Sequence, residues 1–307
     1  MAAGGHGGDE ALTSRAALAL VALGAAVISV TALFVKWISL GPASIGAYRC
    51  AFGAAALAIW VALNRSPGTG PNSQVRPSPR ALAYAVAAGA CFAGDLFVWH
   101  ESILLSGTGL ATLLANTQVF WVALLSALLL GERLSWRLAV CAALALLGVV
   151  LLAIPGLAAS PLHLRGIGLG LATGVFYAGY YLCLRASQRE RARLSLAANL
   201  LVVCATSAAL LFAAALVTGE RIVWPGPTDL WLLLLLGVVA HVGGWLAISR
   251  GMTAVSAASG SLLLLLQPVL ATAWGVMVFG EPFGVYEVTG TLLSLGAIYA
   301  AMLTRGR

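Results

Sequence analysis

The chain has 307 residues, of which 61% are hydrophobic and only 9% charged, and its mean hydropathy is +0.98. An ordinary soluble domain carries roughly 25% charged residues. Apolar surface on this scale excludes a soluble fold, because runs of this length and apolarity belong in lipid. The composition therefore predicts an all-α integral membrane protein, since helices satisfy their own backbone polar groups in lipid.

Ten apolar runs follow a Gly-rich polar lead over residues 1–15, which we expect to be disordered. Each run has about the ~20 residues that a helix needs to cross a bilayer. The predicted spans cover residues 16–35, 43–63, 81–105, 108–130, 136–154, 166–186, 196–217, 229–249, 255–279 and 285–303. The longest joint, residues 64–80, is rich in Pro, Ser and Gly and is typical of a flexible linker. The other joints are too short to hold a soluble domain.

Two stretches match each other at a shift of 149 residues. Residues 113–132 read LLANTQVFWVALLSALLLGE, and residues 262–281 read LLLLLQPVLATAWGVMVFGE. The shift superposes Gln118 on Gln267 and aligns the two Gly-Glu ends. Such an internal repeat predicts a duplicated membrane bundle, an architecture that builds solute pathways. We expect one five-helix repeat over residues 16–154 and a second over 155–307, inverted because five is an odd number of spans.

The basic residues are distributed unevenly over the two sides of the predicted bundle. Thirteen of the 17 Lys and Arg residues fall on the side of the termini, Lys36, Arg165 and Arg221 fall on the other side, and Arg49 lies within a span. The positive-inside rule then places both termini in the cytoplasm. The net charge of +7 is thus a sign of topology, and it gives no support to nucleic-acid binding.

The motifs around the repeat resemble a known family. They are the small-residue runs at 106–111 and 255–260, Gln-Pro at 267–268, and the Gly-Glu ends at 131–132 and 280–281. Together with ten spans in two halves, they are similar to the EamA branch of the drug/metabolite transporter superfamily, and within it to YddG-like amino-acid exporters. The resemblance implies a transporter of the bacterial inner membrane. The first repeat has Val119 where the second has Pro268, so the proline predicts a helix break in the second copy.

Ionisable and polar groups inside spans are candidates for function, because they are expensive in lipid. Asp95 lies near the middle of the third span, on one face with Phe92 and Trp99. It is either a cavity carboxylate that binds an amine or a proton, or the partner of Arg49 in a buried ion pair. His241 superposes on Phe92 in the repeat, so the two should face each other across the pseudo-twofold axis. His241 either titrates near neutral pH or donates to a substrate carboxylate, or it forms a hydrogen bond to a neighbouring helix.

Further polar and aromatic side chains fall at the same depth. Amides here bind a solute or join helices, and tyrosines away from the interface indicate a wet cavity. The predicted substrate-binding set is Asp95, Trp99, Asn116, Gln118, Tyr177, Tyr181, His241, Trp245 and Gln267. Glycines at 166, 170 and 174 predict a smooth helix face for close packing. His100 and Glu101 are predicted to be solvated near the end of their span, with Lys36 or Arg49 as partners of Glu101.

We therefore predict an inner-membrane secondary transporter that moves small metabolites, amino acids first, outward by alternating access, with protons as a candidate coupling ion. The alternatives are a cationic drug exporter, a non-transporting membrane scaffold and an intramembrane enzyme. An enzyme finds little support: residues 100–104, HESIL, begin like HExxH but have Leu104 at the second ligand. No metal or cofactor site is expected, and the five cysteines are interpreted as small packing residues.

Overall fold

The computed structural model describes residues 14–63, 77–131, 135–157, 161–252, 254–255 and 263–305. Its secondary structure over these residues is helical throughout, which confirms the predicted fold class. The helices are α1 (Ser14–Ser29), α2 (Thr31–Trp37), α3 (Pro42–Leu63), α4 (Pro79–Ser106), α5 (Thr108–Ala115), α6 (Gln118–Leu130), α7 (Trp136–Leu157), α8 (Pro161–Arg189), α9 (Leu196–Val217), α10 (Pro227–Leu234), η1 (Leu235–Gly243), α11 (Gly244–Met252), α13 (Leu266–Phe279) and α14 (Val285–Arg305).

Nine predicted spans are present as helices, or as helices joined end to end, that are long and apolar enough to cross a bilayer. The remaining predicted span, 255–279, contains the 14-residue α13 within its described part. Several predicted features lie outside the described residues: most of the disordered lead, most of the linker, Glu132, and residues 256–260 of the second small-residue run.

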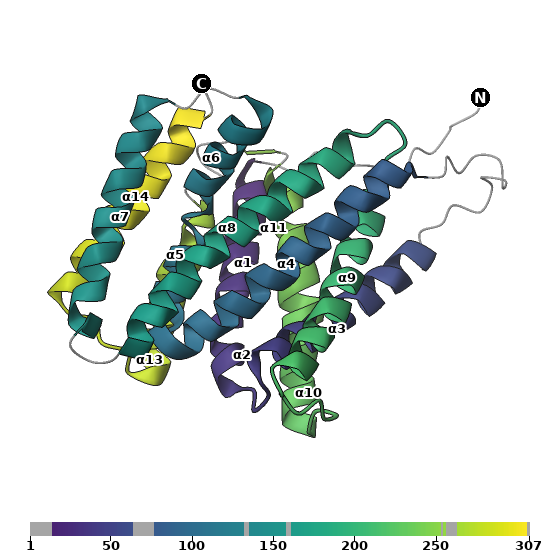
Figure 1. Ribbon diagram of the computed structural model, residues 1–307, viewed down its shortest axis with the longest axis horizontal. Coiled ribbons are helices and arrows are strands. Elements are labelled where there is room, and N and C mark those ends of the chain that lie inside the picture. Colours follow the sequence, from purple (N-terminus) through teal and green to yellow (C-terminus); the bar gives the residue numbers. More distant parts are fainter. Residues whose placement is uncertain are drawn as a thin grey trace.

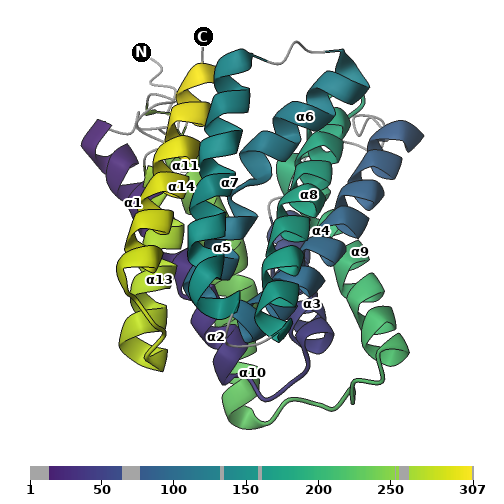
Figure 2. The same ribbon diagram turned by 60° about the vertical axis from the view of Figure 1, so that its left-hand side comes forward.

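The two halves are inverted relative to each other. α7 begins at the end of the bundle where α14 finishes, and the two helices lie side by side in opposite directions (Figure 2). α6, which corresponds to α13 in the sequence repeat, finishes at that same end, whereas α13 finishes at the opposite end (Figures 1 and 2). α1 begins and α14 ends on one side of the bundle, as an even number of spans requires.

Helices from the two halves pack together in pairs: α1 with α11, α3 with α9, α4 with α8, α5 with α13, and α7 with α14. Two of the contacts join residues that the repeat superposes, 149 positions apart. The Ser294 hydroxyl donates to the Ala145 carbonyl at 3.1 Å, and the Phe92 ring stacks on His241 with centroids 5.3 Å apart. The second contact confirms the prediction that Phe92 and His241 face each other.

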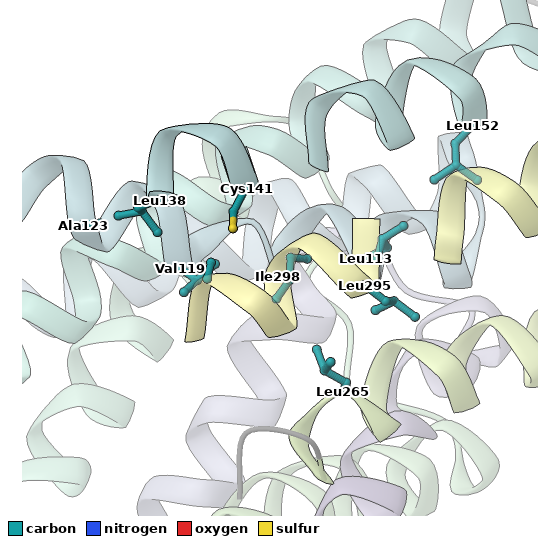
Figure 3. Packing of buried hydrophobic residues seen from close by; sticks show 10 residues of the cluster. Leu113, Val119, Ala123, Leu138, Cys141, Leu152, Leu265, Leu295 and Ile298 are labelled. Carbon is teal, nitrogen blue, oxygen red and sulfur yellow. The ribbon is translucent and has the colours of Figure 1, made fainter. Parts of the chain in front are cut away.

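The glycine face of α8 is also confirmed. A Cβ placed on Gly170 would lie 2.6 Å from Leu114 and 2.9 Å from Ser102, and Gly166 and Gly174 are equally close to their neighbours. Larger residues would therefore push α8 away from α4, α5 and α6. An apolar cluster fills the space between α5, α6, α7 and α14 (Figure 3); its members include Leu113, Val119, Ala123, Leu138, Cys141, Leu152, Leu265, Leu295 and Ile298.

The glycines of the two Gly-Glu ends stop their helices by the same backbone geometry. Gly131 after α6 has φ 68° and Gly280 after α13 has φ 62°. This left-handed conformation closes a helix and is accessible to glycine without the steric cost of a Cβ.

Candidate functional site: a central cavity between the two halves

A cavity of about 370 Å³ lies between the two halves of the bundle. Its wall comes from α1 and α2, from α3 and α4, from both sides of the junction between α5 and α6, and from α8, η1, α11, α13 and α14. Eight of the ten predicted spans thus contribute to one space. All nine residues of the predicted substrate-binding set line it: Asp95, Trp99, Asn116, Gln118, Tyr177, Tyr181, His241, Trp245 and Gln267. Their role in binding stays a prediction.

Asp95 lies on α4 and is 5% exposed, and its Oδ1 has no hydrogen-bond partner among the described residues. Arg49 of α3, 4% exposed, lines the same cavity. Among the described residues, Lys36–Glu281 is the one ion pair with N and O within 4 Å. Asp95 and Arg49 are therefore not directly paired in this conformation, contrary to one of the two roles that the sequence left open for Asp95.

His241 sits in η1, a stretch of π-helix inside the span formed by α10, η1 and α11. Such stretches insert an extra residue into a helical turn and are frequent at functional sites. Its Nε2 lies 3.4 Å from the Cys204 sulfur of α9, and its Nδ1 has no partner among the described residues. One ring nitrogen of His241 thus contacts the neighbouring helix α9, as one of the two expectations predicted, and the residue also lines the cavity.

The helices break in both repeats, and at equivalent positions. α5 ends at Ala115 and α6 begins at Gln118, where Asn116 N donates to the Leu113 carbonyl at 3.1 Å in a tighter turn. The position equivalent to Asn116 is Leu265, which directly precedes α13. The proline thus marks the break in the second copy, as predicted, while the first copy breaks without one. The breaks place Gln118 and Gln267 at the starts of two half-helices that face the cavity.

The two predicted tyrosines differ in their surroundings. Tyr177 lies edge-on to Tyr180, with ring centroids 5.4 Å apart, and Tyr180 in turn lies 5.1 Å from Phe92. Tyr181 lines the cavity but is 46% exposed. Sequence reasoning selected Tyr181 from its spacing to Tyr177 and missed Tyr180. It also treated Arg49 only as a partner for Asp95 or Glu101, although an arginine inside a span was itself a signal of a site.

His100 corrects another expectation. It is fully buried rather than solvated, and its Nδ1 lies 2.9 Å from the Pro42 carbonyl of α3. The position near the end of the predicted span suggested water, but α3 and α9 cover this part of α4. Glu101, one residue on, is half-buried.

A second group of charges lies at the end of the bundle where α13 finishes. Lys36 of α2 pairs with Glu281 at 2.6 Å, which corrects the expected pairing of Lys36 with Glu101. Glu281 Oε1 also accepts the backbone N–H of Thr108 at 2.9 Å, and Oε2 accepts the Thr108 hydroxyl at 3.2 Å. We refer to Lys36, Thr108 and Glu281 as the Glu281 cluster. It borders a second cavity of about 340 Å³.

Comparison with known proteins gives a consistent result. The model of the EamA-like transporter family matches residues 15–154 and again residues 164–303. A Pseudomonas aeruginosa protein, named uncharacterized protein PA1977, is 33% identical over 266 residues, which are 85% of this chain and 84% of that protein. A crystal structure of another protein aligns with 96% of this chain and 100% of its own, with a TM-score of 0.62 and 22% identity. That likeness shows the fold alone.

Proposed function

Because this chain belongs to the EamA-like transporter family, we propose that it carries small metabolites, in the first place amino acids, outward across the bacterial inner membrane. The family makes it a membrane transporter of the drug/metabolite type. The observation that carries the proposal further is the central cavity. It is lined by both repeats, and its polar atoms on Asp95, Trp99 and His241 lack partners within the described part of the chain.

Alternating access is the mechanism that best suits this architecture. Inverted repeats around a midplane site allow one set of helices to rock against the other. The half-helices that carry Gln118 and Gln267 in their first turns bring freed backbone groups to the cavity wall. Such groups are tolerated inside a membrane only where protein or water meets them. The Glu281 cluster links α2, α5 and α13 at one end of the bundle and would have to open when that end opens.

Both termini lie in the cytoplasm in this proposal, since the basic residues gather at their end of the bundle. The Glu281 cluster then faces outward. Cysteines introduced at Arg191 and at Val223, on opposite ends, test the orientation by labelling with a membrane-impermeant maleimide in intact spheroplasts. If R191C is labelled and V223C is not, the protein has the opposite orientation in the membrane, with both termini outside.

The decisive experiment is flux into proteoliposomes that hold the purified protein. Radiolabelled amino acids and organic cations are offered with and without a pH gradient, and empty liposomes are the control. Saturable uptake of amino acids supports the proposal, and its response to the gradient reports proton coupling. Uptake of organic cations alone would favour a cationic drug exporter, for which Asp95 and the aromatic rings offer a suitable wall. No flux of any solute would overturn transport through this cavity.

A further inference from the structure

Arg49 is a buried cation, and the described part of the protein leaves two of its nitrogens without a hydrogen-bond partner. It lies on α3 in the body of the bundle and is 4% exposed. Its Nε and Nη1 have no hydrogen-bond partner among the described residues. A buried charge inside a membrane protein needs an opposite charge or hydrogen bonds to offset its desolvation. The groups that meet Arg49 must therefore come from the cavity that it lines.

The surroundings of Arg49 favour an anion of carboxylate size. Its Cζ lies 5.9 Å from the centre of the Trp99 ring, which leaves the planar guanidinium edge for a ligand. Guanidinium edges match carboxylate and phosphate oxygens with two parallel hydrogen bonds. Among the described residues that line the cavity, Arg49 is the only cation and Asp95 the only anion. The two charges of a phosphate dianion would exceed the single charge of Arg49, whereas the single charge of a carboxylate matches it.

Asp95 lies one helical turn before Trp99 on α4, so the two charges flank the same part of the cavity. Arg49 and Asp95 do not form an ion pair with each other, and each has a side-chain atom without a hydrogen-bond partner among the described residues. In the second repeat the equivalent positions are Ala198 and Gly244. The two charges of the described cavity wall therefore come from the first repeat alone, and amides and aromatic rings line much of the rest.

We propose that Arg49 binds the carboxylate of the transported solute while Asp95 binds its ammonium group, so that the cavity selects zwitterions. This inference rests on the proposed transport function. One α-amino acid joins the two charges and neutralises both. The aliphatic and aromatic walls around them receive its side chain. The site thereby rejects amines without a carboxylate as well as acids without an amine, because each would leave one buried charge unmet.

The test compares three probes that share one side chain: leucine, 3-methylbutylamine, which lacks the carboxylate, and 4-methylpentanoate, which lacks the amine. Phenylalanine and its two analogues repeat the series. Binding to purified full-length protein is measured by isothermal titration. In the wild type we expect leucine or phenylalanine to bind ~10–100-fold more tightly than either analogue, as for hydrogen bonds to charged groups.

Two variants then separate the roles. R49Q should bring the amino acid to within about twofold of the amine, and D95N should bring it to within about twofold of the acid. R49K keeps the positive charge but loses the two parallel N–H donors of the guanidinium. Its preference for the amino acid over the amine should lie between those of the wild type and R49Q. The matched control is R137Q, because Arg137 also lies 5.9 Å from a tryptophan ring, that of Trp136, but outside the cavity. It should bind all three probes as the wild type does.

Several outcomes overturn the inference. One is a wild type that binds the amines as tightly as the amino acids, a comparison that needs no folded variant. Another is R49Q protein that weakens all three probes equally, which would make Arg49 a packing residue. A protein that transports organic cations but binds neither amino acid would refute the role of Arg49 and leave transport standing. Absence of flux for every solute would refute the proposed function itself.

Discussion

The central cavity and the Glu281 cluster both contain charged side chains, which have partners in the cluster but lack them in the described part of the cavity wall. In the cluster, Lys36 pairs with Glu281, and both carboxylate oxygens also accept hydrogen bonds from Thr108. In the cavity, Asp95 Oδ1 and Arg49 Nε and Nη1 have no partner in the described chain, although both residues are more deeply buried. We attribute this difference to function: the charges of the cluster hold helices together and are paired within the protein, whereas in our proposal the charges of the cavity pair with a solute.

The difference has a direct consequence for stability and activity. Removing a satisfied group leaves its partners unmatched and weakens the fold. Removing an unsatisfied buried charge relieves desolvation and should leave the fold intact or stabilise it. Substitutions in the two regions should therefore separate into variants that melt earlier and variants that fold but do not transport.

The largest effect is expected for D95N. If Asp95 were bound to Arg49, its loss would lower the stability by roughly 3–5 kcal/mol and the double variant with R49Q would recover much of it. The structure shows no such pair, so we expect D95N to keep its melting temperature and to lose flux ~10–100-fold. Melting temperature and proteoliposome flux are measured on the same preparation, with D229N at the end of the bundle as control. A low melting temperature of D95N that the added R49Q substitution restores would show that Asp95 and Arg49 are paired, as Lys36 and Glu281 are.

G275A breaks the Glu281 cluster without changing any charge. A Cβ on Gly275 would collide with the Glu281 carboxylate and the Thr108 hydroxyl. Overpacking of this kind destabilises by ~1–3 kcal/mol, which should lower the melting temperature in detergent. Gly296 of α14 has nothing within 4 Å of the corresponding position, so G296A should be neutral or slightly stabilising. Equal melting temperatures for the two variants would show that the cluster does not support the fold.

The aromatic wall of the cavity should yield smaller losses of flux. W99A, Y177A and H241A each remove a ring that lines the cavity. Ring contacts of ~0.5–2 kcal/mol with a solute would correspond to changes of several-fold in apparent affinity. W231A and Y286A remove exposed rings of α10 and α14 and serve as controls. Wild-type apparent affinity in all three cavity variants would assign these rings to packing.

The smallest effect belongs to the Lys36–Glu281 pair taken alone. Its side chains are 20% and 17% exposed, and water near the pair weakens their attraction. A double-mutant cycle of K36M and E281Q should show a coupling free energy of ~0.2–1 kcal/mol in thermal unfolding. Because opening this end breaks the pair, K36M should also make residues of the second cavity, such as T291C, react faster with a soluble thiol reagent. Unchanged labelling would show that the pair does not hold this end closed.

The sequence by itself determined the class, nine of the ten spans, the inverted repeat and a set of nine residues that share one cavity. These follow from short-range facts: the run lengths that lipid requires, the 149-residue repeat, and the depth of polar groups within spans. Depth is readable from sequence because a helix advances by a constant 1.5 Å per residue. For the same reason the pairing of Phe92 with His241 could be predicted, since the repeat superposes them.

Only the tertiary structure decided which polar groups meet. The partner of Lys36 proved to be Glu281, 245 positions away, and His100 proved to be buried against Pro42. Tyr180 of α8 and Arg49 of α3 line the cavity because of how these two helices are rotated in the packed bundle. Helix rotation about its axis is set by the sum of many weak contacts with neighbours, so it appears only when all the helices are packed together.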